Sequence, residues 1–483
     1  MEYIMRIFVF GTGQYFQNRK RQFFEISSSD TLIGFLDNRA YECEKYEGRP
    51  VFLPSVVAEV KFERIILMST YYQEIYEQLV GLGVSADKIF FWEQYRAEKT
   101  LGIKYVYLRK DEEEKGKKSI LLITPDLGYH GGSISIVCAA EVLISNGYRV
   151  WLVAGSCDSD FLQEIMRRGI NIAIVPSLPY LSSEFRLWLE QFDVIIVNVF
   201  SMIKLACDIS QNKPVLWWIH EPDGDNDSIY GYIRYQFSNY DDVQSMKKVR
   251  IYAVSDVARK SFETYYPHQV FDLLPFGIID KNDRNILQGM EDGKVVFAII
   301  GSVCRLKAQL DVLQAANMLS DNIKEKCEFW IIGACGNDGY ANEVRNFAQI
   351  IPNVKFLGIM QRQELHELFS KIDCVVCASQ VETMSLAIVE GMMHEKMCIT
   401  TDQTGIAGYM KDGINGFVYR AGDVVALYNC MQKVFDMRDN SNNIRKNARK
   451  LYEDEFSMER FGERLEYALS ETEKQYHEKY ERK

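Results

Sequence analysis

Short runs of hydrophobic residues alternate with longer amphipathic stretches along the whole chain and fall into three blocks. In the first block these runs occupy residues 7–10, 31–37 and 64–68. Uninterrupted apolar runs of this length are typical of strands buried on both faces, and the helical stretches between them predict parallel sheets covered by helices. At roughly 100–200 residues per domain, the 483 residues suffice for two to four domains.

The second and third blocks continue the alternation and predict two further α/β domains. Strands are predicted at residues 118–124, 149–154, 172–175, 193–199, 215–219 and 249–254 in the second block, and at residues 294–301, 328–332, 354–358, 373–379 and 396–400 in the third. Two such domains in tandem turn the carboxyl ends of their strands, where ligands usually bind, toward a common cleft. We expect domains at residues 1–98, 118–283 and 284–455, a charged linker at 99–117, and a final helix within 456–483 that crosses back over the cleft.

Composition narrows the class of protein. Hydrophobic residues make up 47% and charged residues 25%, which is ordinary for a globular chain and excludes disorder as the main state. The net charge of −11 argues against a protein that grips nucleic acid by its phosphates. The longest apolar runs are strand-sized, and the amino terminus has no basic stretch before an apolar core, so we expect neither a membrane span nor a signal peptide.

The cysteines indicate a reducing compartment and no metal. There are eleven, an odd number, scattered through apolar runs, as is usual for buried, reduced thiols in a cytoplasmic protein. Cys374 and Cys377 form a CxxC pair, but in a strand these positions face opposite ways. No second CxxC or histidine pair completes a zinc set, so we expect both to pack in the core.

A glycine-rich turn follows the first strand. Gly11-Thr12-Gly13 precedes a helix, and the second strand ends in Asp37, an arrangement typical of dinucleotide-binding folds. Phe16 stands where the third glycine of the fingerprint would be. The turn therefore fits either a bound nucleotide or a Rossmann-like turn without a ligand, and a nicotinamide enzyme remains an alternative.

The densest chemical signal lies in residues 378–392. A strand ends near Ser379, a loop carries Glu382, and a helix is predicted to begin near Ser385. Eight helical positions would separate Glu382 from Glu390 by about 12 Å, too far for a glycosidase acid/base pair. The free N–H groups at Met384, Ser385 and Leu386 would form an anion site, with Glu390 near a ribose diol and Glu382 near sugar hydroxyls. The alternative is a pair of solvent-facing glutamates on an amphipathic helix.

This stretch resembles the E-x7-E signature of the family 4 retaining glycosyltransferases, which have the two-domain GT-B fold. Further matches follow in order along the chain: Gly131-Gly132, residues 217–221, Pro275-Phe276-Gly277, residues 301–309, residues 354–358 with Glu364-Leu365, residues 396–401 and residues 413–418. The resemblance extends from about residue 118 to the carboxyl terminus. It implies an α/β chain with GT-B architecture, two facing Rossmann-like domains, preceded by a third, small Rossmann-like domain.

The resemblance also implies roles for particular residues. Catalytic roles fall on His220, Arg305, Lys307 and Glu382, and donor binding on Gly131, Gly132, Gly301, Arg305, Lys307, Gly358, Met384, Ser385, Leu386 and Glu390. Negative charge builds on the leaving diphosphate, so fixed positive charge and N–H donors are needed there. Glu221 is a candidate for acceptor binding. We identify no Asp-x-Asp set that would hold a metal at this site, so we expect no metal and no cofactor beyond the nucleotide-sugar substrate.

Some positions depart from the family pattern and affect donor identity. Ser385 stands where the family has glycine, and Gly391 where it has alanine. We expect a retaining transferase acting on a glycan, lipid-linked or protein hydroxyl in bacterial surface polysaccharide or glycoconjugate synthesis, in the cytoplasm or in peripheral contact with the inner face of the membrane. The alternatives are a non-catalytic GT-B subunit that supports a partner enzyme and a nucleotide-sugar epimerase; the oligomeric state is left open.

Overall fold

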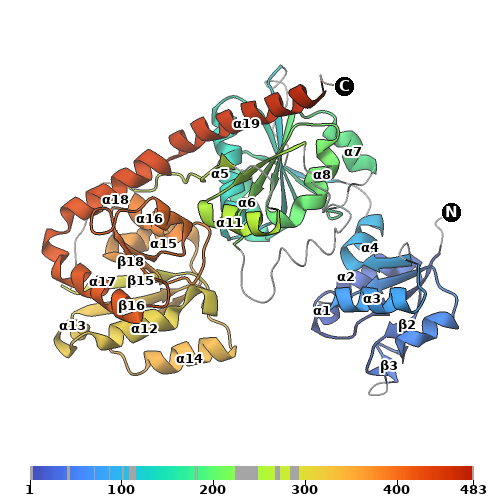
Figure 1. The fold of residues 1–483 in the computed structure, drawn as a ribbon, viewed down its shortest axis with the longest axis horizontal. Coiled ribbons are helices and arrows are strands. Elements are labelled where there is room, and N and C mark those ends of the chain that lie inside the picture. Colours follow the sequence, from blue (N-terminus) through green and yellow to red (C-terminus); the bar gives the residue numbers. More distant parts are fainter. Residues whose placement is uncertain are drawn as a thin grey trace.

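The computed structural model describes residues 4–480 apart from residues 41–43, 70, 86–87, 100–102, 108–115, 180, 182, 223–247, 267–271 and 283–292. Within these residues the chain folds into three α/β domains, each built on its own sheet (Figure 1). The predicted fold class is confirmed. Most of the charge run that was predicted as a linker lies outside the described residues.

The N-terminal domain has a six-stranded sheet in the order β3-β4-β2-β1-β5-β6. Its elements are β1 (Arg6–Phe10), α1 (Gln14–Gln17), α2 (Lys20–Ile26), β2 (Thr31–Leu36), β3 (Lys45–Tyr46), β4 (Arg49–Phe52), β5 (Arg64–Leu67), α3 (Tyr72–Gly81), β6 (Ile89–Phe91) and α4 (Trp92–Lys99). The ring of Phe16 is fully buried and makes an edge-to-face contact with Phe35, 5.2 Å between centroids. A core side chain therefore fills the place of the third glycine, and Asp37 accepts a hydrogen bond from the Thr12 hydroxyl at 2.7 Å.

The second domain has an eight-stranded sheet in the order β14-β13-β12-β11-β8-β9-β10-β7. Its strands are β7 (Lys104–Tyr107), β8 (Ser119–Leu127), β9 (Arg149–Cys157), β10 (Asn171–Ile174), β11 (Val194–Asn198), β12 (Val215–Ile219), β13 (Val249–Ala253) and β14 (Asp272–Leu273), and its helices are α5 (Gly131–Ser145), α6 (Ser159–Arg167), α7 (Ser183–Leu189), α8 (Ile203–Ser210) and α11 (Asp256–Tyr265). β7 lies in the segment that is predicted from the sequence to be a linker. It pairs antiparallel with β10 as an edge strand, and a four-residue edge strand gives little signal in the sequence.

The third domain has a wholly parallel sheet in the order β17-β16-β15-β18-β19-β20. Its elements are β15 (Val295–Ile300), α12 (Gln309–Met318), α13 (Asp321–Glu325), β16 (Cys327–Ile332), α14 (Gly339–Ala348), β17 (Val354–Gly358), α15 (Arg362–Leu368), β18 (Cys374–Cys377), α16 (Leu386–Met393), β19 (Met397–Thr401), β20 (Phe417–Tyr419) and α17 (Val424–Asp436). Cys374 and Cys377 are buried in β18 and belong to different core clusters on opposite faces of the sheet, as predicted.

Two final helices tie the third domain back to the second. α18 (Asn442–Glu455) lies against α16, and α19 (Met458–Tyr480) continues over α5, β12 and β13 (Figure 1). Residues 274–282, between the second and third domains, are called the strap here. Arg449 in α18 pairs with Asp280 in this strap and donates to the Met393 carbonyl at 2.7 Å. A Cβ on Gly277 would lie 2.5 Å from the Cβ of Phe461, so only glycine lets the strap pass under α19.

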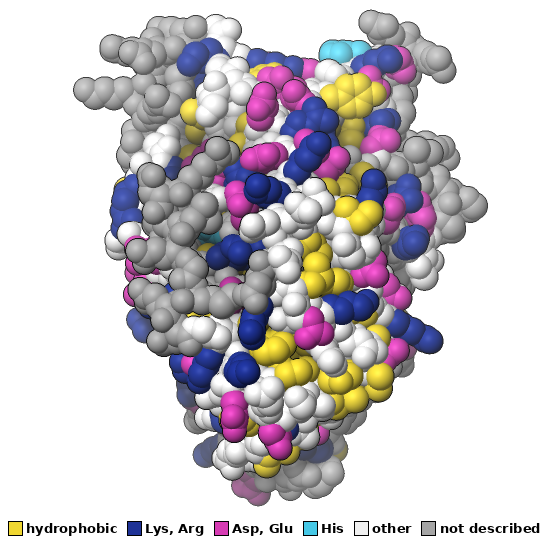
Figure 2. Space-filling model, turned by 90° about the vertical axis from the view of Figure 1, so that its left-hand side faces the viewer, with side chains coloured by type: hydrophobic (Ala, Val, Ile, Leu, Met, Phe, Trp, Pro, Cys, Tyr) yellow, Lys and Arg dark blue, Asp and Glu magenta, His cyan; other side chains and the backbone are white. Residues whose placement is uncertain are grey.

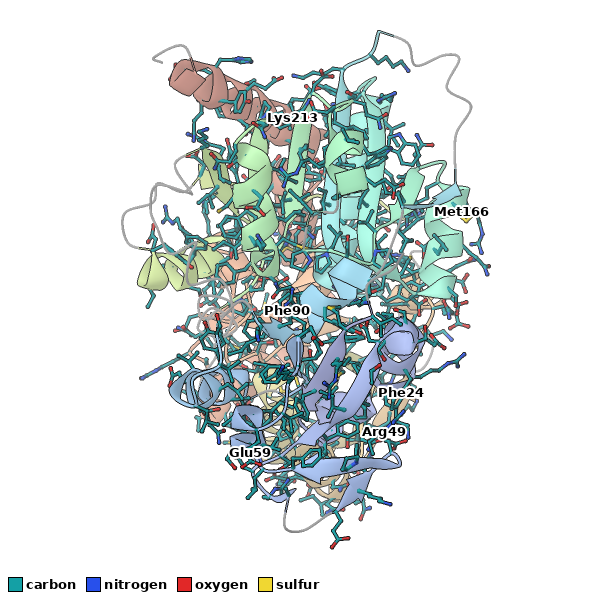
Figure 3. The ribbon with its side chains drawn as sticks, turned by 90° about the vertical axis from the view of Figure 1, so that its right-hand side faces the viewer. Phe24, Arg49, Glu59, Phe90, Met166 and Lys213 are labelled. Atoms are coloured by element: carbon teal, nitrogen blue, oxygen red, sulfur yellow. The ribbon has the colours of Figure 1, made fainter. Side chains whose placement is uncertain are left out.

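The N-terminal domain adjoins the second domain, with Phe90 in β6 near the level where the two meet (Figure 3). Arg96 donates to the Leu178 carbonyl across this boundary at 3.3 Å. Among the residues searched, no helix is long and apolar enough to cross a membrane. On the face shown in Figure 2 acidic and basic side chains are interspersed, and hydrophobic side chains gather in the lower half of the view.

Candidate functional site

A cavity of about 680 Å³ lies between the second and third domains. On the third-domain side it is lined by the loops after β15, β16 and β17 and by the start of α16, and on the second-domain side by the start of α5 and the end of β12. The walls are therefore built from the carboxyl ends of parallel strands and from helix amino termini, where α/β folds usually bind ligands.

Lys307 projects into this cavity from the loop after β15. The loop makes a short 3₁₀ turn over Arg305–Lys307 and then passes through Ala308, whose φ of 49° starts α12 from the left-handed region. The Nζ atom of Lys307 lies 2.6 Å from Oε2 of Glu382, and the lysine side chain is 33% exposed. Burial lowers the pKa of this ammonium, but the Glu382 carboxylate more than offsets that effect, and the net pKa is raised. Lys307 is therefore a fixed positive charge at neutral pH.

Glu382 is held in place by the strand end before it. The Ser379 hydroxyl donates to Oε2 of Glu382 at 2.9 Å, and the Glu382 backbone N–H donates to the Gln403 carbonyl at 3.1 Å. The loop that follows reaches Ser385, the N-cap of α16, and Met384, Ser385 and Leu386 all line the cavity. The first-turn N–H groups of a helix have no intrahelical partner, so this wall can stabilise an anion.

Glu390 lies one turn into α16 and is only 1% exposed. Its carboxylate pairs with the guanidinium of Arg362, the first residue of α15, and both residues line the cavity. Burial raises the pKa of Glu390, and Arg362 opposes that rise. Glu390 is predicted from the sequence to lie near a ribose diol. Arg362 is not predicted, because it carries no motif of its own and meets Glu390 only through the packing of α15 and α16.

Glycines bring two loops of the third domain into close contact at the cavity floor. A Cβ on Gly333 would lie 2.4 Å from the Gly301 carbonyl oxygen, and both residues have φ near 140°. Gly301 lines the cavity, and a Cβ on it would lie 3.5 Å from Cε of Lys307. Gly358 does not line the cavity; its carbonyl accepts from the Gly333 N–H at 2.8 Å, so it supports the neighbouring loop instead.

Arg305, one of the two cations predicted for the diphosphate, is not brought into the cavity. Its side chain is 78% exposed, its guanidinium stands 5.3 Å from the centre of the Tyr340 ring, and the nearest carboxylate oxygen, on Glu343, is 4.0 Å away. In a 3₁₀ turn with three residues per turn, positions two apart face different directions. Lys307 and Arg305 therefore cannot both point inward from this turn.

The second-domain wall holds His220, at the end of β12, with its ring 4.4 Å from that of Trp218. Burial, with a smaller effect from His130, lowers the pKa of His220 to about 3, so the imidazole is neutral. Its Nε2 atom is buried and has no hydrogen-bond partner among the described residues. Glu221, a candidate for acceptor binding, instead accepts from the Phe200 backbone N–H at 2.8 Å.

Gly131 and Gly132 begin α5 and also line the cavity. A Cβ on Gly132 would lie 3.5 Å from Val199 and 3.7 Å from the Asn198 amide, so a larger residue would fill the gap beside the helix start. Of the twelve sequence-predicted site residues, the structure gathers all but Arg305 and Gly358 around one cavity. Within the described residues no cluster of three or more potential metal ligands occurs.

Three family models match successive parts of the chain. The model for group 1 glycosyl transferases matches residues 281–451, the model for family 4 glycosyltransferases matches residues 115–230, and a model named C2185-like, N-terminal, matches residues 3–90. EpsD of Bacillus subtilis (strain 168), a protein named as a glycosyltransferase, is 27% identical over 132 residues, 27% of this chain and 33% of that protein. The chain thus spans about a third of the length of this curated relative.

Solved structures share the fold. HepE of Anabaena, in complex with UDP and glucose, superposes with a TM-score of 0.62 at 15% identity and covers 73% of this chain and 100% of its own. Sucrose-phosphate synthase of Thermosynechococcus elongatus gives a TM-score of 0.57 at 14% identity and covers 74% of this chain and 99% of its own. Glycosyltransferase family models thus match both halves of the chain's GT-B fold, and the chain carries an additional N-terminal domain.

Proposed function

We propose that this protein is a retaining glycosyltransferase that takes a sugar from a nucleoside-diphosphate sugar and transfers it to a hydroxyl of a glycan, a lipid-linked saccharide or a glycoprotein. The main support for the proposal is that the Lys307 ammonium and the amino terminus of α16 lie on the same wall of an interdomain cavity. Both favour a negative charge at the same place, which is what a leaving diphosphate needs.

The remaining groups suit the rest of such a donor. Glu390 would accept hydrogen bonds from the ribose diol, Glu382 from the sugar hydroxyls, and the neutral His220 would face the sugar near the reacting carbon. In same-face attack the leaving diphosphate takes up the acceptor proton, so no separate base is required. Closure of the two domains would exclude water from the cavity. Seven lining positions thus have a use in one ligand, and none of these uses requires a metal ion.

The ligands bound in similar structures favour UDP among the nucleotides. HepE of Anabaena was solved with UDP-glucose, and TarM of Staphylococcus aureus with UDP and α-GlcNAc-glycerol. We infer a UDP-sugar donor as the first to test, and a place at the cytoplasmic face of the membrane where lipid-linked or polysaccharide acceptors are made. WaaG, another structure with this fold, is named as taking part in lipopolysaccharide biosynthesis.

The test is a panel of UDP-, GDP-, dTDP- and ADP-sugars, with release of the nucleoside diphosphate measured with and without methyl glycosides as acceptors. We expect release with one donor class, unchanged by a chelator, and a product whose anomeric configuration in proton NMR equals that of the donor. An inverted product would refute the retaining mechanism. Conversion of the donor without nucleotide release would indicate an epimerase, and no reaction with any donor would favour the non-catalytic subunit.

A further inference from the structure

The chain passes between the second and third domains twice, once through the strap and once through the junction of α18 and α19 (Figure 1). The two crossings touch each other. Ile278 in the strap forms a parallel bridge with Ser457, and its N–H donates to the Phe456 carbonyl at 3.0 Å. Relative movement of the two domains bends the chain at these crossings, so Ile278, Phe456 and Ser457 are called the hinge.

One tryptophan of the second domain contacts both crossings. Trp218, in β12, donates its indole N–H to the Leu274 carbonyl of the strap at 2.8 Å. Its ring stacks on the ring of Phe461 in α19, with 5.6 Å between the centroids and 27° between the planes. Both side chains are fully buried. Phe461 also packs against the strap, because its Cβ lies 2.5 Å from the place of a Cβ on Gly277. Trp218 is therefore held from two sides by segments that lead to the hinge.

The other side of the same indole meets His220. Alternate side chains along a strand share a face, and the imidazole follows two positions after Trp218, directly beyond the end of β12. The two rings lie edge to face, with 4.4 Å between the centroids and 62° between the planes. Nε2 of His220 has no hydrogen-bond partner among the described residues. No hydrogen bond from Nε2 to these residues fixes the imidazole, so packing on Trp218 limits the directions in which the ring can point.

We propose that Trp218 is a positioning residue that ties the imidazole of His220 to the hinge. When the domains close, a shift of Leu274 or Phe461 moves the indole, and the indole sets where the imidazole stands in the cavity. A displacement of about 1 Å near reacting atoms can lower a rate by about 10²-fold, so such a tie matters for turnover. The inference rests on the proposed transferase function, in which His220 faces the donor sugar.

The residue before Trp218 provides a matched control. Trp217 is also fully buried in β12, and its indole N–H also donates to a backbone carbonyl, that of Val199, at 2.8 Å. Its ring belongs to the core cluster on the other face of the sheet, where it stacks on Phe200 with 5.7 Å between the centroids. Replacement of either tryptophan by phenylalanine removes one indole N–H and part of one buried ring. The two variants differ in that only Trp218 contacts the strap, α19 and His220.

The kinetic test uses the donor that the panel identifies, with a methyl glycoside as acceptor. We expect Trp218→Phe to lower kcat about 10-fold while the Kd for UDP stays within twofold, because His220 faces the sugar and not the nucleotide. Trp217→Phe should keep kcat within twofold of wild type. The double variant Trp218→Phe, His220→Ala should be no slower than His220→Ala, since Trp218 acts through His220. Equal kcat in the two tryptophan variants, or losses that multiply in the double variant, would overturn the proposal.

A second measurement needs no donor. The chain has six histidines, so ¹H–¹³C NMR of the full-length protein with labelled histidine gives few ring signals, and that of His220 is assigned by its loss in His220→Gln. Phe461→Leu removes the ring between the hinge and Trp218. Phe262→Leu is its control, because Phe262 is equally buried and contacts Trp217 with 5.4 Å between the centroids. We expect the His220 signal to move in Phe461→Leu and to stay in place in Phe262→Leu.

An unmoved His220 signal in Phe461→Leu, or equal shifts in the two phenylalanine variants, would overturn the tie to the hinge even in an active enzyme. If wild type releases nucleotide from no donor, the transferase function fails instead. The NMR comparison still decides in that case whether Trp218 ties His220 to the hinge.

Discussion

The ammonium of Lys307 lies 2.6 Å from the carboxylate of Glu382, and this contact joins the loop after β15 to the loop after β18. Both residues line the cavity that we propose for the donor. Because their charges are opposite and in contact, each compensates the charge of the other when no donor is bound. A diphosphate would compete with Glu382 for Lys307. The pair therefore holds a cation ready at the site while keeping its desolvation cost low.

Removal of Lys307 should abolish most turnover. Lys307→Ala takes away the fixed positive charge beside the leaving diphosphate, and we expect nucleotide release from the donor to fall by about 10²-fold, equivalent to about 3 kcal/mol of transition-state stabilisation. Lys355→Ala is the matched control, because Lys355 pairs with Glu328 at 2.7 Å in the same domain but lies outside the cavity. Equal rates in the two variants would show that the site is misplaced.

Neutralising Glu382 should have opposite effects on nucleotide binding and on turnover. Glu382→Gln frees Lys307 from its carboxylate partner, so UDP should bind several-fold more tightly, by roughly 1 kcal/mol. Transfer should fall, because the carboxylate proposed to hold the sugar is lost. Calorimetry with UDP and a steady-state assay measure the two effects. Weaker UDP binding in this variant would contradict the competition between Glu382 and the diphosphate.

The pair of Arg362 and Glu390 should matter for stability as well as for binding. Arg362→Met leaves the buried Glu390 carboxylate without its partner, and we expect the free energy of unfolding to fall by about 3 kcal/mol, the lower end of the usual range because Arg362 is partly exposed. Adding Glu390→Gln should restore much of that loss, since a neutral amide needs no counter-charge. Urea unfolding measures both variants. Additive losses in the double variant would mean that the two residues are not coupled.

A single methyl group should disturb the crossing of the final helix. Gly277→Ala would place a Cβ 2.5 Å from the Cβ of Phe461 and 2.8 Å from the Ser457 carbonyl oxygen. The strap or α19 must shift, at a cost of about 1–3 kcal/mol in the free energy of unfolding. Gly339→Ala is the control, because a Cβ on Gly339 at the start of α14 would meet nothing within 4 Å. Equal stability of the two variants would refute the close packing of the strap.

The buried histidines should make the protein less stable in acid. Burial lowers the pKa of His220 and His366 to about 3 and that of His394 to about 4, against 6.5 for the ordinary side chain. Between pH 6.5 and pH 4 the unfolded chain therefore binds more protons than the folded one, and stability falls as the pH drops, by up to about 1.4 kcal/mol per pH unit for each histidine.

His366 and His394 allow a direct test, because their ring nitrogens are 3.2 Å apart and neither is proposed to contact substrate. We expect urea unfolding of the double variant His366→Asn, His394→Asn to lose about 2–3 kcal/mol less than wild type between pH 7.5 and pH 5.5. The same loss in both proteins would show that these imidazoles are not kept neutral by the fold.

Much of the fold could be read from the sequence because strands buried on both faces leave continuous apolar runs. Every strand predicted in the second and third domains is present, with ends displaced by a few residues, and the helix predicted near Ser385 begins at Leu386. The edge strand β7 was missed because its four residues are flanked by polar and charged sequence and gain their pairing only from β10.

The sequence by itself determined which residues can be near a ligand, since order along the chain places Lys307, Glu382 and Glu390 after strands of one parallel sheet, whose carboxyl ends share an edge. Only the tertiary structure decided which side chains point inward. The 3₁₀ turn directs Arg305 outward, and helix packing brings Arg362 to Glu390. Side-chain direction and partnership depend on backbone geometry and on neighbours distant in the sequence, which no local pattern encodes.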